Sequence, residues 1–405
     1  ELVVIKQTSK QYHNVKTQLF RKDVSEIIIA TDAGREGELV ARWILDKSGC
    51  HKPIRRLWIS SVTDKAIKEG FAHLKDVRAY NDLYHAARSR AEADWLVGIN
   101  ATRALTCKYN AQLSCGRVQT PTLAMIAHRE QQIRSFKPED YYGLRCTTSV
   151  TGGSVGTMAS IVTWTWQQKK SGSLRSFNKD LITGLDKKLK NQTLTVTDVH
   201  TSSKRTPSPG LYDLTELQRD ANKRFGFSAK ETLNIMQSLY EHHKVLTYPR
   251  TDSRYIGTDI VPTIKERLKA CNIGPYKKYI PELLKKPLKT SKAFVDDKKV
   301  SDHHAIIPTE EYVQMEHMSN NERKIYDLVV RRFISVLYPA FEYEQTTLKA
   351  EAVGETFTAK GKVIKAAGWK AVYADAVSSG SSASQYDAYG DYEDSEDFGE
   401  DFQNN

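Results

Sequence analysis

The chain has 405 residues, five cysteines and a formal net charge of +11. At this length more than one domain is expected, and no apolar run reaches the roughly 18 residues that a membrane-spanning helix needs. The odd cysteine count, with no Cys-x-x-Cys pair, argues against both a disulfide framework and a zinc ribbon. Because the first residues also lack the basic-then-apolar layout of a signal peptide, we expect a soluble cytoplasmic protein.

The charge is unevenly distributed. Residues 371–405 contain nine of the 49 acidic groups and none of the 60 basic groups, which leaves 1–370 with a net charge of +20. Such an excess favours a polyanionic partner, because lysine and arginine neutralise phosphates. The segment 377–405 has almost no aliphatic residues, so we expect a disordered acidic tail there.

The first third of the chain is expected to begin with alternating strands and helices. A buried strand is predicted over 24–30 and an amphipathic helix from Glu38 to about Lys47. A second strand over 56–60 and a helix over 64–71 follow. This order is typical of an α/β unit with a parallel sheet.

The rest of the chain is expected to be first helical, then β-rich, then helical again and finally β-prone. Residues 80–134 are predicted to be helical, with Trp95, Ile99 and Arg103 four residues apart and a turn at 114–116. The other expected elements are antiparallel strands over 141–200, helices over 213–225 and 228–243, helices over 259–271 and 320–337, and a β-prone stretch over 342–374.

The segment around Tyr248 points to covalent chemistry. Tyr248 is followed by Pro249 and Arg250, so a phenol and a guanidinium lie close together on a stiff backbone, just past a predicted helix end. A free phenol has a pKa of about 10, so an attacking tyrosine needs a cation or base beside it at neutral pH. Arg250 is placed to be that cation. Read alone, the same residues also suit a tyrosine whose hydroxyl faces water.

Asp32 and Glu36 follow the first predicted strand, at the end where open α/β sheets place their ligand sites. The glycines between and after them, Gly34 and Gly37, allow a ligand to approach the backbone. Two carboxylates suit Mg²⁺, which keeps several waters and commonly bridges carboxylates to phosphate. Acids that simply cap the following helix are the alternative interpretation.

Three further side chains are candidates for contact with a nucleic-acid backbone. Arg117 and Gln119 stand at alternate positions after Gly116, where both can reach one strand, and a guanidinium suits bidentate phosphate binding. His303, beside His304, is a candidate hydrogen-bonding partner of a phosphate or of the attacking phenol. Each of these residues also fits an ordinary surface position, and no zinc-ligand spacing accompanies the histidines.

Together these segments resemble type IA DNA topoisomerases, and residues 1 to about 374 are similar to the bacterial topoisomerase III branch of that family. The matching motifs occur in the family's order. They are Thr31–Glu38, Ala93–Gly98, Gly116–Gln119, Phe225–Lys230, the tyrosine segment and His303–Ile306.

The resemblance implies a multidomain α and β protein with the toroidal fold of the family, in which a partial Toprim α/β domain precedes helical and β-rich domains. It implies ATP-independent cleavage of single-stranded DNA through a 5′-phosphotyrosine link at Tyr248, then strand passage and religation. Such an enzyme relaxes negative supercoils or decatenates DNA. The residue roles carried over are Mg²⁺ binding for Asp32 and Glu36, stabilisation of the pentacovalent phosphate for Arg250, assistance at the phosphate or phenol for His303, and positioning of the DNA backbone for Arg117 and Gln119.

The resemblance also divides the chain into six segments. They are a partial Toprim domain with the metal site (1–75), a helical DNA-binding segment (76–140), a β-rich gate segment (141–210), a helical domain with the catalytic tyrosine (211–341), a return segment of the gate (342–376) and the acidic tail (377–405). The implied partners are single-stranded and negatively supercoiled DNA and a helicase, with no membrane. The protein is expected to be a monomer at the bacterial nucleoid.

The sequence departs from the family pattern in three places. Gly34 stands where the family usually has a third acid, as in some topoisomerase III sequences. The family's opening strand with a Glu-Lys pair is absent, and the resemblance ends near Ala374, so we expect a chain truncated at both ends. Two other functions therefore stay open: a cleavage-incompetent fragment that binds single-stranded DNA, and a nuclease or primase that uses the Toprim acids alone.

Overall fold

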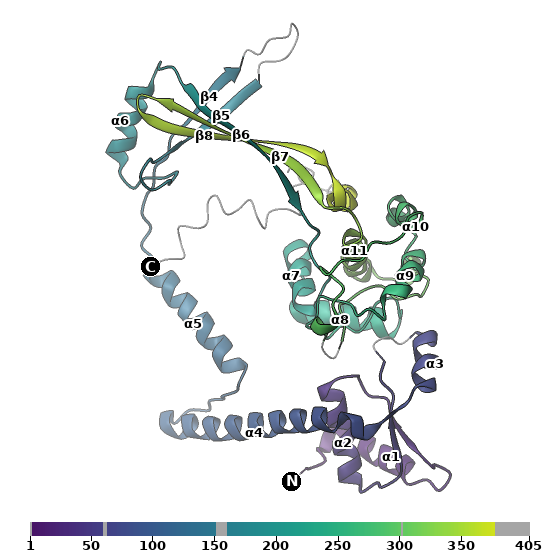
Figure 1. The fold of residues 1–405 in the computed structure, drawn as a ribbon. Helices are drawn as coiled ribbons and strands as arrows, with labels where there is room; N and C mark the ends of the chain where they lie inside the picture. The colour runs from purple at the N-terminus through teal and green to yellow at the C-terminus, as the bar shows by residue number, and fades with distance from the viewer. Residues whose placement is uncertain (1, 60–62, 151–159, 301–302, 377–405) are drawn as a thin grey trace. The chain divides into compact units, whose positions relative to one another are not determined.

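The computed structural model describes residues 2–59, 63–150, 160–300 and 303–376, and the chain is compact in two units (Figure 1). The predicted acidic tail, 377–405, lies outside the described residues. The first unit contains Glu1–Leu123, Ser208–Tyr338 and the chain from Val372, and the second contains Ala124–Pro207 and Pro339–Ala371. Within the described ranges, no helix has both the length and the apolar character to cross a membrane.

The first unit opens with a three-stranded sheet. β1 (Ile27–Ile29) pairs in parallel with β2 (Ile54–Arg56), and β3 (Lys75–Asp76) pairs antiparallel with β2. The predicted α/β opening with a parallel strand pair is therefore confirmed. The second strand lies earlier than the predicted range of 56–60, of which residue 60 is outside the described part.

Three helices accompany this sheet. α2 (Arg35–Ser48) starts three residues before the predicted Glu38 and ends at Gly49, whose φ of 71° is left-handed and therefore suits glycine. α3 (Asp64–Ala72) is capped by the Thr63 hydroxyl, and α1 (Ser9–Leu19) was not predicted. The buried core of this part contains Leu19, Ile29, Ala41, Leu45 and Cys50.

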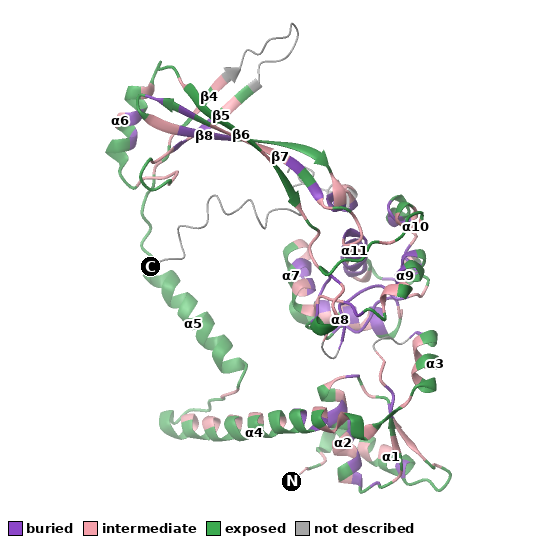
Figure 2. Cartoon of the chain, viewed as in Figure 1, coloured by how far each residue is buried: buried purple, intermediate pink, exposed green. Residues whose placement is uncertain are grey.

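Two long helices follow, α4 (Asn81–Tyr109) and α5 (Gln119–Ser135). α4 buries Tyr84 and Ala87 near its start, and α5 has no buried residue (Figure 2). The predicted break at 114–116 falls in the loop between them. A helix that packs so little of its surface has little tertiary stabilisation of its own.

The remaining helices of the first unit surround α11 (Asn320–Ser335), which is buried at every position from Leu328 to Ser335. The others are α7 (Leu214–Phe225), α8 (Ala229–Glu241), α9 (Ile264–Ala270) and α10 (Ile280–Leu284). All but α10 correspond to predicted helices. α8 and α11 end two residues earlier than predicted, and α9 begins five residues later, after a short 3-10 turn at Val261–Thr263.

Side-chain caps fix the starts of α7 and α8. The Asp213 carboxylate accepts from the Glu216 N–H at 2.7 Å at the start of α7, and Gly226 ends that helix with a φ of 71°. The Ser228 hydroxyl accepts from the Glu231 N–H at 3.1 Å and opens α8. These local bonds explain why the two helix boundaries are readable from the sequence.

The second unit is a five-stranded antiparallel sheet in the order β4-β5-β8-β7-β6. β7 (Phe341–Ala352) and β8 (Glu355–Ala366) form a hairpin, and β6 (Thr195–Thr206) pairs along β7. β4 (Arg145–Val150) and β5 (Ser160–Gln167) complete the sheet beside β8. The predicted β-rich stretches on either side of the helical part thus pair in one sheet.

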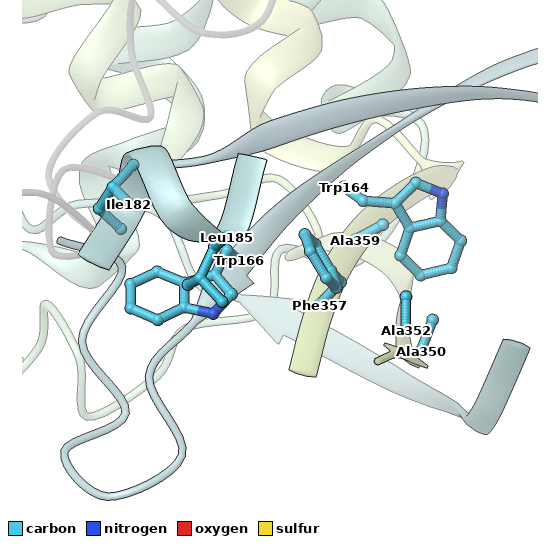
Figure 3. Close-up of a cluster of buried hydrophobic side chains, with 8 residues drawn as sticks. All are labelled: Trp164, Trp166, Ile182, Leu185, Ala350, Ala352, Phe357 and Ala359. Carbon is cyan, nitrogen blue, oxygen red and sulfur yellow. The ribbon is translucent and has the colours of Figure 1, made fainter. Parts of the chain in front are cut away.

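Helix α6 (Lys179–Leu189) lies inside the range that was predicted to contain only strands. The Asn178 side chain caps it by accepting from the Leu181 N–H at 3.0 Å. Its Ile182 and Leu185 are buried in the same cluster as residues of the sheet, because the strand side chains on that face need an apolar cover. The cluster, drawn in Figure 3, contains Trp164, Trp166, Ile182, Leu185, Ala350, Ala352, Phe357 and Ala359.

Candidate active site

Tyr248 lies on an extended segment after α8 that is joined by backbone bonds to a second segment further along the chain. The Thr247 N–H donates to the Ile307 carbonyl at 3.0 Å, and the Thr247 hydroxyl accepts from the Ile307 N–H at 3.0 Å. Leu246 forms an antiparallel bridge with Pro308. Because both segments are buried here, these bonds satisfy the backbone and hold the tyrosine in place.

The Tyr248 side chain contacts three predicted or neighbouring site residues. Its hydroxyl donates to the Asp32 carboxylate at 3.2 Å. The His303 ring lies 4.2 Å from the tyrosine ring, centroid to centroid, and Tyr240 packs edge-on at 5.5 Å. The structure therefore brings together three of the predicted residues, Tyr248, Asp32 and His303.

The phenol of Tyr248 is held in its protonated form. Burial raises the pKa of Tyr248 above its usual value, and the Asp32 charge and hydrogen bond raise it further. The exposed Arg250 guanidinium lowers the pKa of Tyr248, but by less than these effects raise it. The predicted cation thus acts in the expected direction, and the Asp32 carboxylate is the hydrogen-bond acceptor for the phenolic proton.

Arg56 holds the loop that carries Asp32. Its guanidinium is fully buried and donates to the backbone carbonyls of Thr31 at 2.8 Å and Asp32 at 2.6 Å. The same group bonds the buried Glu38 carboxylate at 2.9 Å. Burial lowers the pKa of Arg56, and the charge of Glu38 opposes that effect. A second arginine, Arg42, bonds the other Glu38 oxygen at 2.9 Å, so the carboxylate is paired twice.

Glu36 lies in the first turn of α2, where a carboxylate is stabilised by the helix dipole, and both Glu36 and Asp32 are exposed to solvent. In the part of the chain that the structure describes, no group of three or more His, Cys, Asp or Glu side chains is arranged to hold a metal. Mg²⁺ needs fewer protein ligands than that, because it is usually bound through one or two carboxylates together with water and substrate phosphate. Asp32, which is bonded to the tyrosine, and Glu36, four residues further on, are both exposed carboxylates and therefore fit Mg²⁺.

The two neighbouring histidines differ in environment. His304 is buried and its Nδ1 lies 2.7 Å from the Ala305 carbonyl, and burial lowers the pKa of His304 to about 4. His304 is therefore neutral at pH 7. His303 is 7% exposed, and a Cβ placed on Gly34 would lie 3.4 Å from its Nε2 atom. The position of the missing third acid is thus directly beside His303.

Arg117 lies in the loop between α4 and α5, and Gln119 is the first residue of α5. No hydrogen bond or ring contact described for the structure joins either residue to Tyr248. The Arg117 guanidinium forms a two-pronged ion pair with Asp94 of α4. The Gln119 amide donates to the Ser114 hydroxyl at 3.4 Å. Both side chains are exposed, so each can contact a ligand.

Sequence reasoning missed two residues of this site. Arg56 was predicted only as part of a strand. An arginine at a buried strand position needs a buried partner for its charge, and this is the signal that could have identified Arg56 as a site residue. Tyr240 lies in the predicted helix 228–243 and was assigned no role, and its ring packs edge-on against Tyr248. Burial and the Asp32 charge raise the pKa of Tyr240 to about 12.

Comparison with known proteins gives matches over most of the chain. A family model described as DNA topoisomerase matches residues 78–392, and a Toprim domain model matches residues 3–62. The chain is 62% identical over 373 residues to DNA topoisomerase 3 of Bacillus cereus (strain ATCC 14579), and 60% identical to that of Bacillus subtilis (strain 168). In both cases the match covers 92% of this chain and 50% of the relative, so the chain spans about half the length of these relatives.

A solved structure, full-length topoisomerase I from Thermotoga maritima, matches with a TM-score of 0.67 at 23% sequence identity. The match covers 92% of this chain and 58% of that chain. At this identity the match shows a shared multidomain α/β fold.

Proposed function

The chain belongs to the type IA DNA topoisomerases and is similar to their topoisomerase III members, and on that premise we propose that it cuts single-stranded DNA through a transient ester at Tyr248. The observation that supports this proposal is the hydrogen bond from the Tyr248 hydroxyl to the Asp32 carboxylate, beside His303 and Arg250. A buried tyrosine with a proton acceptor and a cation beside it is arranged as an activated nucleophile.

In the cleavage step, the Tyr248 oxygen bonds to the phosphorus of the scissile phosphodiester and the bond from phosphorus to the 3′ oxygen breaks. The phenolic proton is lost to water and the 3′ oxygen takes up a proton from water to become a hydroxyl, while the Asp32 carboxylate, which accepts the hydrogen bond of the phenol, orients it. Religation reverses these changes, because the ester keeps the free energy of the original bond. No ATP is needed, and a passing strand between the two steps changes the linking number.

Charge on the phosphate oxygens in the transition state needs preplaced cations. Arg250 is exposed next to the tyrosine and can bond the phosphate, and His303 lies against the phenol ring, where it can donate to the same group. Asp32 and Glu36 would hold Mg²⁺, which would neutralise phosphate charge when bound. Arg117 and Gln119 would contact the backbone of the strand away from the reacting phosphate.

We propose further that the protein acts as a monomer near the nucleoid in the cytoplasm, that it relaxes or decatenates DNA, and that a helicase supplies single strands. The net charge of +20 on residues 1–370 supports binding to a polyanion. These attributes rest on similarity to the family.

The decisive test is covalent trapping. Incubation of the protein with a single-stranded oligonucleotide and Mg²⁺ should give a denaturant-resistant adduct that maps to the Tyr248 peptide, and Tyr248→Phe should abolish it. Tyr255→Phe is the matched control, because Tyr255 lies in the same loop region and its hydroxyl accepts from Lys299 at 3.2 Å. Binding without an adduct would favour the binding-fragment interpretation, and cutting that survives Tyr248→Phe would favour a nuclease.

A further inference from the structure

Trp95 is unusually exposed for its size. Its side chain is 64% accessible, whereas Trp164, Trp166 and Trp369 are 2–3% accessible. All six tryptophans lie in the described residues, and none of the other five is classed as exposed. An indole left in water forgoes the burial that such a large apolar group normally gains, so an exposed one marks a candidate binding position.

The helix around Trp95 is fixed against the loop that carries Arg117. The Thr102 hydroxyl accepts from the Cys115 N–H at 2.9 Å, and a Cβ on Gly98 would lie 3.7 Å from the Cys115 carbonyl oxygen. Trp95, Gly98 and Thr102 follow i, i+3, i+7 spacing and therefore share one side of α4. Because Gly98 has no side chain, the next turn of the helix does not cover the indole.

A guanidinium is held at the residue that precedes Trp95 in α4. Asp94, the preceding residue, holds the Arg117 guanidinium through two bonds, one of which is 3.0 Å long. Arg117 keeps half of its side chain accessible in this pair. The hydrogen bond to Arg117 lowers the pKa of Asp94, so the carboxylate is ionised and keeps the guanidinium in position at neutral pH.

Exposed apolar and cationic side chains follow Trp95 along α4. Ile99 and Arg103, at i+4 and i+8, are both exposed, so an aromatic ring, an aliphatic side chain and a guanidinium follow one another along α4. Figure 2 shows this part of α4 largely uncovered. Aromatic side chains that alternate with cations along a surface are the usual arrangement for binding a single strand.

We propose that Trp95 is a base-stacking platform for the single DNA strand whose backbone Arg117 contacts. This inference rests on the proposed function and adds a residue that acts on the bases. A base that lies on the indole is bound without regard to its hydrogen-bonding edge, because every base has a π-face. Trp95 therefore adds affinity for the strand and positions one base, without selecting which base it is.

The occupant is a nucleotide base and not an apolar protein surface, because charged groups flank the indole. Protein interfaces exclude charges from their centre, whereas Asp94 and Arg117 form an ion pair at the position before Trp95, and Arg103 is exposed eight residues after it. A phosphate next to a stacked base can accept hydrogen bonds from these guanidinium groups, whereas an apolar helix offers them no acceptor.

The test measures binding of an oligothymidylate to Tyr248→Phe protein, in which the proposed cleavage cannot interfere. Trp95→Ala should weaken binding about tenfold, Trp95→Phe should retain most of the affinity, and the slope of log affinity against log salt should stay the same in both. Arg117→Ala, by contrast, should reduce that slope by about one. Binding should also quench tryptophan fluorescence in the parent protein and not in Trp95→Phe.

Leu96→Ala is the matched control, because Leu96 is the next residue of α4, is 50% exposed and points about 100° away around the helix. Equal weakening by Leu96→Ala and Trp95→Ala, or unchanged affinity in Trp95→Ala, would overturn the proposal. The covalent adduct measured separately with wild-type Tyr248 tests the proposed function, so an adduct with unchanged Trp95→Ala binding would remove the stacking platform and leave the cleavage reaction standing.

Discussion

At the scale of single residues, the hydroxyl of Tyr248 and the carboxylate of Asp32 are joined by a hydrogen bond across 216 positions of sequence. The bond serves two purposes. It orients the phenol, and it raises the pKa of Tyr248 together with burial, so that the phenol is neutral at pH 7. Arg250 opposes this effect from the other side.

A pH prediction follows from that arrangement. Asp32→Asn removes the charge that raises the pKa of Tyr248, while the burial stays, so the phenol should ionise at lower pH than in the wild type. The measurement is the ultraviolet phenolate absorbance on raising the pH, compared between Asp32→Asn and Asp32→Asn/Tyr248→Phe. If the phenolate that depends on Tyr248 appears at the same pH with and without Asp32, the carboxylate has no such influence.

Arg56 provides a second prediction at this scale. Arg56→Lys keeps a positive charge but loses the planar fork that bonds two loop carbonyls and Glu38, so the loop with Asp32 should loosen. We expect a loss of stability of about 3 kcal/mol, since a partner of a buried ion pair is weakened, and a smaller yield of adduct. Thermal unfolding and adduct yield, each measured beside the exposed variant Arg55→Lys, check this, and an Arg56→Lys protein as stable and as active as Arg55→Lys would contradict it.

At the scale of elements, α11 forms the centre of the helical part of the first unit. Its N-terminus has a complete capping box, in which the Ser319 hydroxyl accepts from the Glu322 N–H and Glu322 accepts from the Ser319 N–H. Burial raises the pKa of Glu322, but bonds from the Ser238 hydroxyl and the Ser319 backbone outweigh it and lower the pKa to about 2. The helix start is thus tied to the end of α8, which leads to Tyr248.

Buried tyrosines around α11 predict alkaline instability. Burial raises the pKa of Tyr212, Tyr276 and Tyr326 well above 10. A raised folded-state pKa gives stability that is complete below the unfolded value of about 10 and is lost as the pH rises toward the folded value. The denaturant concentration at the unfolding midpoint should therefore decrease as the pH is raised from about 10 to about 12. Tyr326→Phe should reduce the slope of unfolding free energy against pH by the equivalent of one proton. A slope that Tyr326→Phe leaves unchanged would show that this phenol does not take part.

At the scale of the whole molecule, the uneven charge is the dominant feature. A net charge of +20 on residues 1–370 favours a polyanionic partner, and we propose that the acidic residues of 377–405 compete with that partner for the same cations. Deletion of 377–405 removes eight acidic groups and no basic ones. Oligonucleotide binding should then tighten at low salt, and the difference should shrink near physiological salt, where the screening length is about 8 Å.

A variant in which 377–405 is replaced by a glycine and serine tail of equal length distinguishes the effect of the tail's charge from the effect of its size. If this variant binds the oligonucleotide as tightly as the deletion variant does, the charge of the tail is responsible. Equal affinity of all three proteins at low salt would reject competition by the acidic end.

The sequence alone determined the family, because the family motifs are local features of the chain. The order of the acid, glycine, arginine and tyrosine motifs and the alternation along the strands are short-range signals, and the family match and the fold class are confirmed. The roles of Asp32, Glu36, Arg117, Gln119, Tyr248, Arg250 and His303 stay predictions.

Tertiary structure alone decided which distant residues meet. Asp32 and Tyr248, Arg56 and the loop carbonyls, and α6 with the sheet of the second unit are contacts between segments far apart in the chain. No local pattern specifies such pairs, because their energy comes from burial and from hydrogen bonds that exist only after folding. The same reason explains why the buried partners of Arg56 and the packing of Tyr240 could not be foreseen.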